Sequence, residues 1–123
     1  MTATAVIRVL LADDDLDIRE ALRDLLAADP GLAVVAVCPD GVHARERVRD
    51  EAPDVAVLDV RMPGGGAELV RDLHAQGIGV VCFSADASAQ EEMLAAGAAE
   101  FLVKGGRLVD LGGAIRRVAH AAS

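Results

Sequence analysis

Residues 9–26 have the sequence VLLADDDLDIREALRDLL: an apolar run, three aspartates and an amphipathic pattern in succession. The apolar run, which begins at Val6 and ends at Ala12, is typical of a strand buried on both faces, although periodicity alone does not exclude a buried helix. The pattern over Leu16–Ala28 predicts a helix that Pro30 ends. Its expected buried stripe consists of Ile18, Leu22, Leu25 and Leu26.

The same alternation continues to the end of the chain. Short apolar runs rich in β-branched residues predict further strands at Leu32–Cys38, Val55–Leu58, Ile78–Phe83 and Phe101–Val103. Helical spacing of apolar residues predicts further helices at Val42–Asp50, Ala67–Ala75, Ala87–Ala96 and Leu108–Ala121. Five alternating pairs predict an α/β fold of the (βα)5 type, a doubly wound five-stranded parallel sheet with helices on both faces. We expect residues 1–123 to form a single domain.

The composition restricts the class of protein. The chain is 53% hydrophobic but only 2% aromatic, and 24 alanines are present, so small aliphatic side chains must build the core. A net charge of −8 disfavours direct nucleic-acid binding, because neutralising phosphates requires basic groups. The basic residues are eleven arginines and one lysine, Lys104. That imbalance makes Lys104 a residue of special interest.

The sequence also indicates a cellular compartment. No apolar run has the length of roughly 20 residues that a transmembrane helix needs, and the start of the chain lacks the pattern of a secretory signal. Cys38 and Cys82 lie in apolar runs without metal-ligand spacing. We interpret them as buried free thiols rather than a disulfide or redox pair. These features predict a cytoplasmic protein with no membrane association.

Polar residues stand where the predicted strands end. Asp13–Asp15 follow the first strand, and Asp59, Ser84 and Lys104 follow the third, fourth and fifth. In an open parallel sheet these ends meet at one edge, where doubly wound folds bind their ligands. The sequence therefore predicts a crevice that contains carboxylates, one hydroxyl and one amine.

Each of these residues has a simpler interpretation. Asp15 can cap the following helix, and the pair Asp13 and Asp14 can be capping or solvated residues. A serine that follows a strand, as Ser84 does, is often the N-cap of the next helix, and an isolated lysine is usually a surface residue. Close carboxylates repel one another, however, and Mg²⁺, which prefers oxygen ligands, would relieve that repulsion. Asp59, otherwise an ordinary turn residue, then becomes a candidate nucleophile for a phosphoryl group.

The chain resembles the receiver domain of bacterial two-component response regulators over nearly its whole length. The resemblance rests on VLLADDDLDIREALRDLL, PDVAVLDVRMPG, VVCFSAD and AAGAAEFLVK, together with their order and spacing. It implies a flavodoxin-like fold with strand order 2-1-3-4-5. It also implies that Asp59 is the phosphoacceptor and that Mg²⁺ is bound by Asp14 directly, by Asp13 mainly through water, by Asp59, and by the backbone carbonyl of Arg61.

The resemblance further implies a switch. Ser84 would hydrogen-bond the phosphoryl group, Lys104 would pair with Asp59 and then with a phosphoryl oxygen, and Phe101 would turn inward. The phosphoryl donor would be a sensor histidine kinase or phosphotransfer protein. The domain would promote its own phosphorylation and dephosphorylation without being an enzyme in the usual sense. The face of the fourth helix, fifth strand and fifth helix would act on an output domain or partner, and could form a homodimer.

The sequence departs from the family pattern in three places. The loop Met62–Ala67 is about one residue short and very rich in glycine, so we expect it to be mobile. Gly105 stands where many relatives have proline, which resembles regulators with a LuxR-type helix-turn-helix DNA-binding output domain. Arg61 and Asp86 occupy variable positions beside the phosphorylation site, and we expect them to form an ion pair that slows dephosphorylation.

Three other functions are compatible with parts of the sequence. A pseudo-receiver would bind proteins without being phosphorylated, but such proteins usually lose an acid-pair member, the phosphoacceptor or the lysine, and none is lost here. An unrelated flavin-binding protein would normally supply stacking aromatics, and this chain has only Phe83 and Phe101. A phosphohydrolase with an aspartate nucleophile usually has a second aspartate two residues later, where this chain has Arg61.

Overall fold

A computed structural model describes residues 5–104 and 110–121, and in them five parallel strands form one sheet in the order β2-β1-β3-β4-β5. The strands are β1 (Ile7–Ala12), β2 (Leu32–Cys38), β3 (Val55–Asp59), β4 (Gly79–Ser84) and β5 (Glu100–Val103). The helices are α1 (Leu16–Ala27), α2 (Gly41–Glu51), α3 (Ala67–Ala75), α4 (Gln90–Ala96) and α5 (Leu111–Ala121). This confirms the predicted fold and strand order. Gly105 and the predicted helix start at Leu108 lie outside the described residues.

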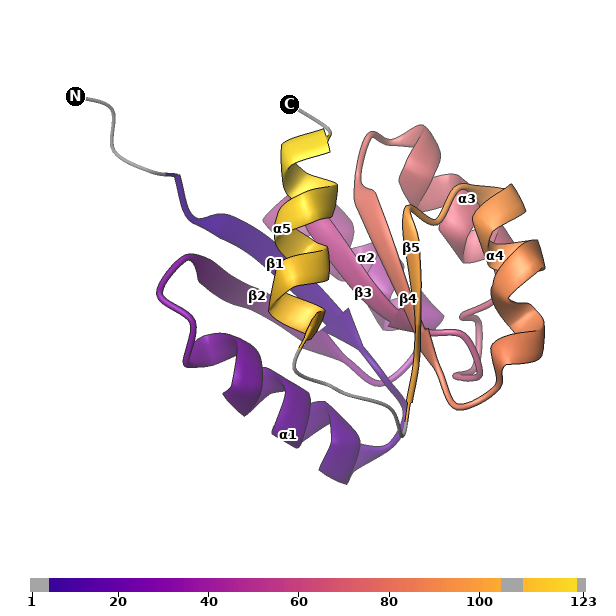
Figure 1. Ribbon diagram of the computed structural model, residues 1–123, viewed down its shortest axis with the longest axis horizontal. Coiled ribbons are helices and arrows are strands. Elements are labelled where there is room, and N and C mark those ends of the chain that lie inside the picture. Colours follow the sequence, from indigo (N-terminus) through magenta and orange to yellow (C-terminus); the bar gives the residue numbers. More distant parts are fainter. Residues whose placement is uncertain (1–4, 105–109, 122–123) are drawn as a thin grey trace.

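Helices cover both faces of the sheet. Figure 1 shows α1 and α5 in front of it and α2 behind it. Because side chains alternate along a strand, Val9 and Leu11 of β1 pack with α1 and α5, while Leu10 and Ala12 pack with α2, α3 and α4. All four are at most 1% exposed, so β1, an interior strand of the sheet, is buried on both faces, as its continuous apolar sequence predicts.

The helices differ from the sequence predictions in two details. The predicted helix Ala87–Ala96 is divided into a 3₁₀ turn, η1 (Ala87–Ala89), followed by α4, and the side chain of Asp86 accepts a hydrogen bond from the Ser88 amide at 2.8 Å. Leu25, predicted to be buried, is 45% exposed, whereas the other predicted residues of that stripe are buried or partly buried. Burial of Leu25 was therefore a wrong prediction.

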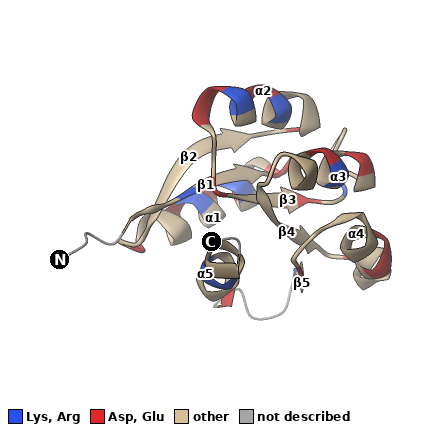
Figure 2. Cartoon of the chain, turned by 90° about the horizontal axis from the view of Figure 1, so that it is seen from above, with Lys and Arg blue, Asp and Glu red and all other residues tan. Residues whose placement is uncertain are grey.

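The charged residues lie mainly on the helices, whereas the strands carry few of them (Figure 2). Such a distribution is expected of a sheet that is covered on both faces. Within residues 5–104 and 110–121, no helix combines the length and the apolar character needed to cross a bilayer.

The two thiols should be unreactive in the folded protein. Cys38 and Cys82 are buried and free, as predicted, and burial raises the pKa of Cys38 to about 11 and that of Cys82 to about 12. At neutral pH both groups are therefore protonated, and the thiolate is the reactive form. We expect a thiol reagent such as DTNB to label neither cysteine of the native protein at pH 7 and both in urea. Rapid labelling before unfolding would contradict this account.

Candidate functional site

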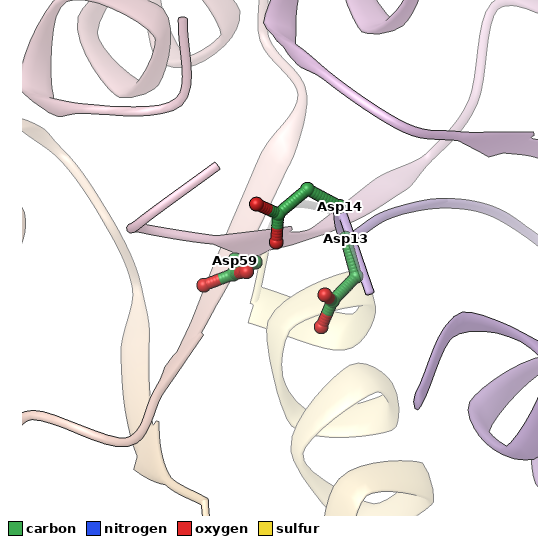
Figure 3. Close-up of side chains that lie close together, drawn as sticks. All are labelled: Asp13, Asp14 and Asp59. Atoms are coloured by element: carbon green, nitrogen blue, oxygen red, sulfur yellow. The ribbon is translucent and has the colours of Figure 1, made fainter. Parts of the chain in front are cut away.

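Three carboxylates meet at the carboxyl ends of β1 and β3. Asp13 and Asp14 follow β1 directly, and Asp59 is the last residue of β3. The two strands pair in parallel, with Ala12 opposite Leu58, so their carboxyl ends lie side by side. One oxygen from each carboxylate lies within 4.8 Å of the others. Figure 3 shows the three side chains close together. Asp13 and Asp59 are only 1% and 4% exposed, while Asp14 faces solvent.

Lys104 joins two of these carboxylates. Its Nζ lies 2.8 Å from Oδ2 of Asp13 and 3.4 Å from Oδ2 of Asp59. Its backbone amide donates a hydrogen bond to the Ser84 carbonyl at 2.7 Å, which holds the end of β5 against β4. The ammonium group also lies 5.4 Å from the centre of the Phe83 ring, within the range of a cation–π contact. The predicted convergence of Lys104 with the aspartates is thus present in the structure.

The site carries an excess of negative charge. Burial raises the pKa of Asp59; the hydrogen bond from the Arg61 amide and the charge of Lys104 oppose this effect, and the charge of Asp13 adds to it. Burial by itself would lower the pKa of Lys104, but its contacts with Asp13 and Asp59 raise it overall. Lys104 is therefore charged at neutral pH. One ammonium among three carboxylates leaves room for another cation.

Asp13 and Asp15 have different structural roles. Oδ1 of Asp15 accepts a hydrogen bond from the Ile18 amide at 3.1 Å and caps α1, as predicted. Asp13 instead accepts a hydrogen bond from the Asp15 amide at 2.9 Å through Oδ1, which leaves Oδ2 for the lysine. Arg19 donates to the Asp13 carbonyl at 2.8 Å. Nothing in the sequence pattern indicated this last contact, because Arg19 lies on a helix face with other charged residues.

Ser84 and Phe101 lie on the neighbouring strands. Ser84 ends β4 and is fully buried, and its hydroxyl accepts a hydrogen bond from the Asp86 amide at 3.1 Å. The cap of η1 is the Asp86 side chain, so Ser84 is not a helix cap. Phe101 of β5 is partly buried and packs against the core between the sheet and α2, α3 and α4. It pairs in register with Cys82 of β4.

Arg61 makes two contacts: its backbone amide contacts the site, and its side chain contacts Asp86. Its amide donates a hydrogen bond to Oδ1 of Asp59 at 3.0 Å. Its guanidinium forms the predicted ion pair with Asp86, between side chains that are 65% and 35% exposed. Hydrogen bonds from Ser88, followed by the contact with Arg61, hold the pKa of Asp86 below its usual value. The ion pair thus joins the loops that follow β3 and β4. The family resemblance implies a role for the Arg61 carbonyl, whereas the hydrogen bond from the Arg61 amide to Asp59 was not predicted from the sequence.

The glycine-rich loop after β3 is held by several contacts. The Gly65 amide donates to the Met62 carbonyl at 3.0 Å, and the Gly41 amide of α2 donates to the Pro63 carbonyl at 2.8 Å. The Met62 side chain is 3% exposed and belongs to the core. These contacts show how the loop is packed in the structure, and its mobility stays a prediction.

Comparison with protein families identifies the relatives of this chain. The family model described as "Response regulator receiver domain" matches residues 9–116. The DNA-binding transcriptional activator DevR/DosR of Mycobacterium tuberculosis is 39% identical over 119 residues, which cover 92% of this chain and 54% of that protein. A protein-glutamate methylesterase/protein-glutamine glutaminase of Rhodospirillum rubrum is 38% identical over 104 residues, covering 80% of this chain and 29% of that protein. The chain thus spans about a third to a half of these two relatives.

Solved structures give the same assignment. The response regulator domain of Thermotoga maritima CheB superposes with a TM-score of 0.84 at 29% identity, covering 94% of this chain and 97% of that one. A LuxR-family response regulator from Aurantimonas sp. SI85-9A1 superposes with a TM-score of 0.88 at 28% identity, covering 95% of this chain and 87% of that one. Family match, sequence relatives and fold agree, and this chain belongs to the response regulator receiver domains of two-component systems.

Proposed function

We propose that this domain is a phosphoacceptor switch and that Asp59 accepts a phosphoryl group from the phosphohistidine of a sensor histidine kinase or phosphotransfer protein. The observation that carries the proposal is the cluster of three carboxylates bridged by the Lys104 ammonium. A carboxylate oxygen of Asp59 attacks phosphorus, a P–O bond forms as the P–N bond breaks, and the imidazole leaves. In such transfers positioning and electrostatics supply most of the catalysis.

The donor set fits Mg²⁺. Asp13, Asp14 and Asp59 supply hard oxygen ligands, and the Lys104 ammonium neutralises only one of their three charges. These carboxylates would hold the ion, with Asp13 acting mainly through water and the Arg61 carbonyl as a further ligand. When bound, the ion supplies charge neutralisation at the phosphoryl oxygens.

The residues of the chain position the nucleophile and receive the product. The Arg61 amide holds one oxygen of Asp59 at 3.0 Å, and Lys104 holds the other at 3.4 Å. After transfer, the Lys104 ammonium pairs with a phosphoryl oxygen, and the Ser84 hydroxyl leaves the Asp86 amide to donate to another. The partly buried Phe101 then turns inward, which shifts the equilibrium between two states of the domain.

The output acts through the face of α4, β5 and α5. Leu94 and Val103, on α4 and β5, are 40% and 43% exposed, which supports a contact surface for a second copy or for an output domain. The name of the DevR/DosR relative supports a DNA-binding output domain in a longer chain. The net charge of −8 disfavours nucleic-acid binding by residues 1–123 themselves. The free thiols of Cys38 and Cys82 support a cytoplasmic location.

Acetyl phosphate provides the test of this function. We expect incubation with acetyl phosphate and Mg²⁺ to add one phosphoryl group, detected by intact-mass spectrometry, and EDTA to prevent the addition. Asp59→Asn should abolish it, whereas Asp72→Asn, which changes an exposed carboxylate on α3, should not. A folded protein that remains unmodified by several phosphodonors would favour the pseudo-receiver, a protein-binding module that functions without phosphorylation.

The ion pair between Arg61 and Asp86 should lengthen the life of the phosphorylated state. The pair joins the loops that follow Asp59 of β3 and Ser84 of β4, and side chains in that position would restrict the approach of water to phosphorus. An exposed pair contributes roughly 0.2–1 kcal/mol, so we expect Arg61→Ala to shorten the phosphoryl half-life by a factor of about 1.4 to 5. Arg45→Ala, which removes the exposed pair between α2 and α3, is the matched control. An unchanged or longer half-life in Arg61→Ala would count against this role.

A further inference from the structure

The start of α2 lies in direct contact with the loop after β3. The Gly41 amide donates to the Pro63 carbonyl at 2.8 Å. A Cβ atom added to Gly41 would lie 2.0 Å from the carbonyl oxygen of Gly64 and 2.5 Å from its carbonyl carbon. These are backbone atoms that cannot rotate away, so any residue other than glycine at this position would displace the loop.

The next residue of the same loop, Gly65, lies close to the backbone of the phosphoacceptor, Asp59. A Cβ atom added to Gly65 would lie 2.8 Å from the carbonyl oxygen of Asp59 and 2.6 Å from the Met62 side chain. Arg61 lies between Asp59 and Met62 in the chain, and its amide donates a hydrogen bond to the Asp59 carboxylate at 3.0 Å. The loop therefore contacts the start of α2 through Gly64 and the backbone of Asp59 through Gly65.

We propose that Gly41 is a positioning residue for the phosphoacceptor. Its missing side chain lets α2 approach the loop closely, and that contact sets where the Arg61 amide meets the Asp59 carboxylate. This inference rests on the proposed function of Asp59, and Gly41 itself touches none of the reacting atoms.

Hydrogen bonds and core packing hold the start of α2 in place. Oδ1 of Asp40 accepts hydrogen bonds at 2.8 Å from both the backbone amide and the imidazole Nδ1 of His43, which close the first turn of the helix. On the inner side of the helix, Ala44 is fully buried in the core. Contacts on both sides therefore hold Gly41 in place against the loop.

Gly41→Ala and Gly77→Ala form a matched pair. Gly77 lies at the opposite edge of the sheet, between α3 and β4, with a φ of +82° and nothing near its added Cβ, so its substitution strains the backbone without touching the site. We expect Gly41→Ala to move the Arg61 amide resonance in ¹H–¹⁵N spectra without phosphodonor. We also expect it to slow phosphorylation by acetyl phosphate by on the order of tenfold to a hundredfold. Gly77→Ala should lower the unfolding midpoint and change neither readout.

Two further variants complete the experiment. Gly66→Ala lies in the same loop with open space around its added Cβ and should behave as wild type. If Gly41→Ala does not fold, Asp40→Ala replaces it; this variant loosens the first turn of α2 and should displace the Arg61 resonance and slow phosphorylation in the same direction.

The proposal is overturned if the folded Gly41→Ala, or Asp40→Ala in its place, changes the Arg61 resonance and the rate no more than Gly77→Ala does. Failure of the wild type to be phosphorylated would refute the proposed function instead. The amide resonance would still test the contact in that case, because it needs no phosphodonor.

Discussion

Lys104→Ala should destabilise the metal-free protein by about 2–4 kcal/mol, because removing one partner of a buried ion pair leaves its counter-charges unpaired. Here the lysine side chain is 16% exposed, and the two carboxylates that it joins, those of Asp13 and Asp59, would remain buried without a cation. Urea unfolding in EDTA measures the loss. Added Mg²⁺ should recover more stability in the variant than in the wild type, since it supplies the missing positive charge.

Lys104→Arg separates the charge of this residue from its shape. Arginine keeps the cation, so the variant should fold and lose much less stability than Lys104→Ala does. Its planar guanidinium is bulkier and directs its donors differently from a compact ammonium, so we expect the phosphorylation-driven switch to be impaired. The readout is the change in amide resonances of Ser84 and Phe101 after phosphorylation. If Lys104→Arg switches as the wild type does, the single lysine among eleven arginines reflects composition alone.

Leu26→Ala should destabilise the domain by about 3 kcal/mol, because Leu26 is 1% exposed and a cavity would remain in the core between the sheet and α1. Its neighbour Leu25 is 45% exposed, and Leu25→Ala should change stability by less than about 0.5 kcal/mol. The two variants remove the same atoms from adjacent positions of one helix. Equal losses in urea unfolding would contradict the placement of α1.

The sequence predicts the strands better than the faces of the helices. Continuous β-branched runs that end in aspartate or serine place β1, β3 and β4 to within one residue, because a doubly covered strand tolerates few polar groups. A helical stripe has less definite edges. At 100° per residue Leu25 and Leu26 cannot both occupy its centre, and the packing of α1 on β2 and the sheet decides which of them is buried.

The sequence also predicts which side chains converge at the site, but not how they pair. Parallel strands bring their carboxyl ends to one edge whatever the details of packing, so the sequence places Asp13, Asp59 and Lys104 at that edge. The shorter contact of the lysine with Asp13 than with Asp59 depends on long-range packing that no local pattern encodes. The same holds for the fit of Gly41 against Gly64, which depends on the separation of two loops.

The most direct test of the central claim identifies the carboxylate that carries the phosphoryl group. Borohydride reduces an acyl phosphate to an alcohol, so it converts a phosphorylated aspartate to homoserine, which peptide mass spectrometry can locate. After treatment with acetyl phosphate and Mg²⁺, we predict homoserine at position 59 alone. Homoserine at position 13 or 14, or at no position in a folded and donor-treated protein, would contradict the account.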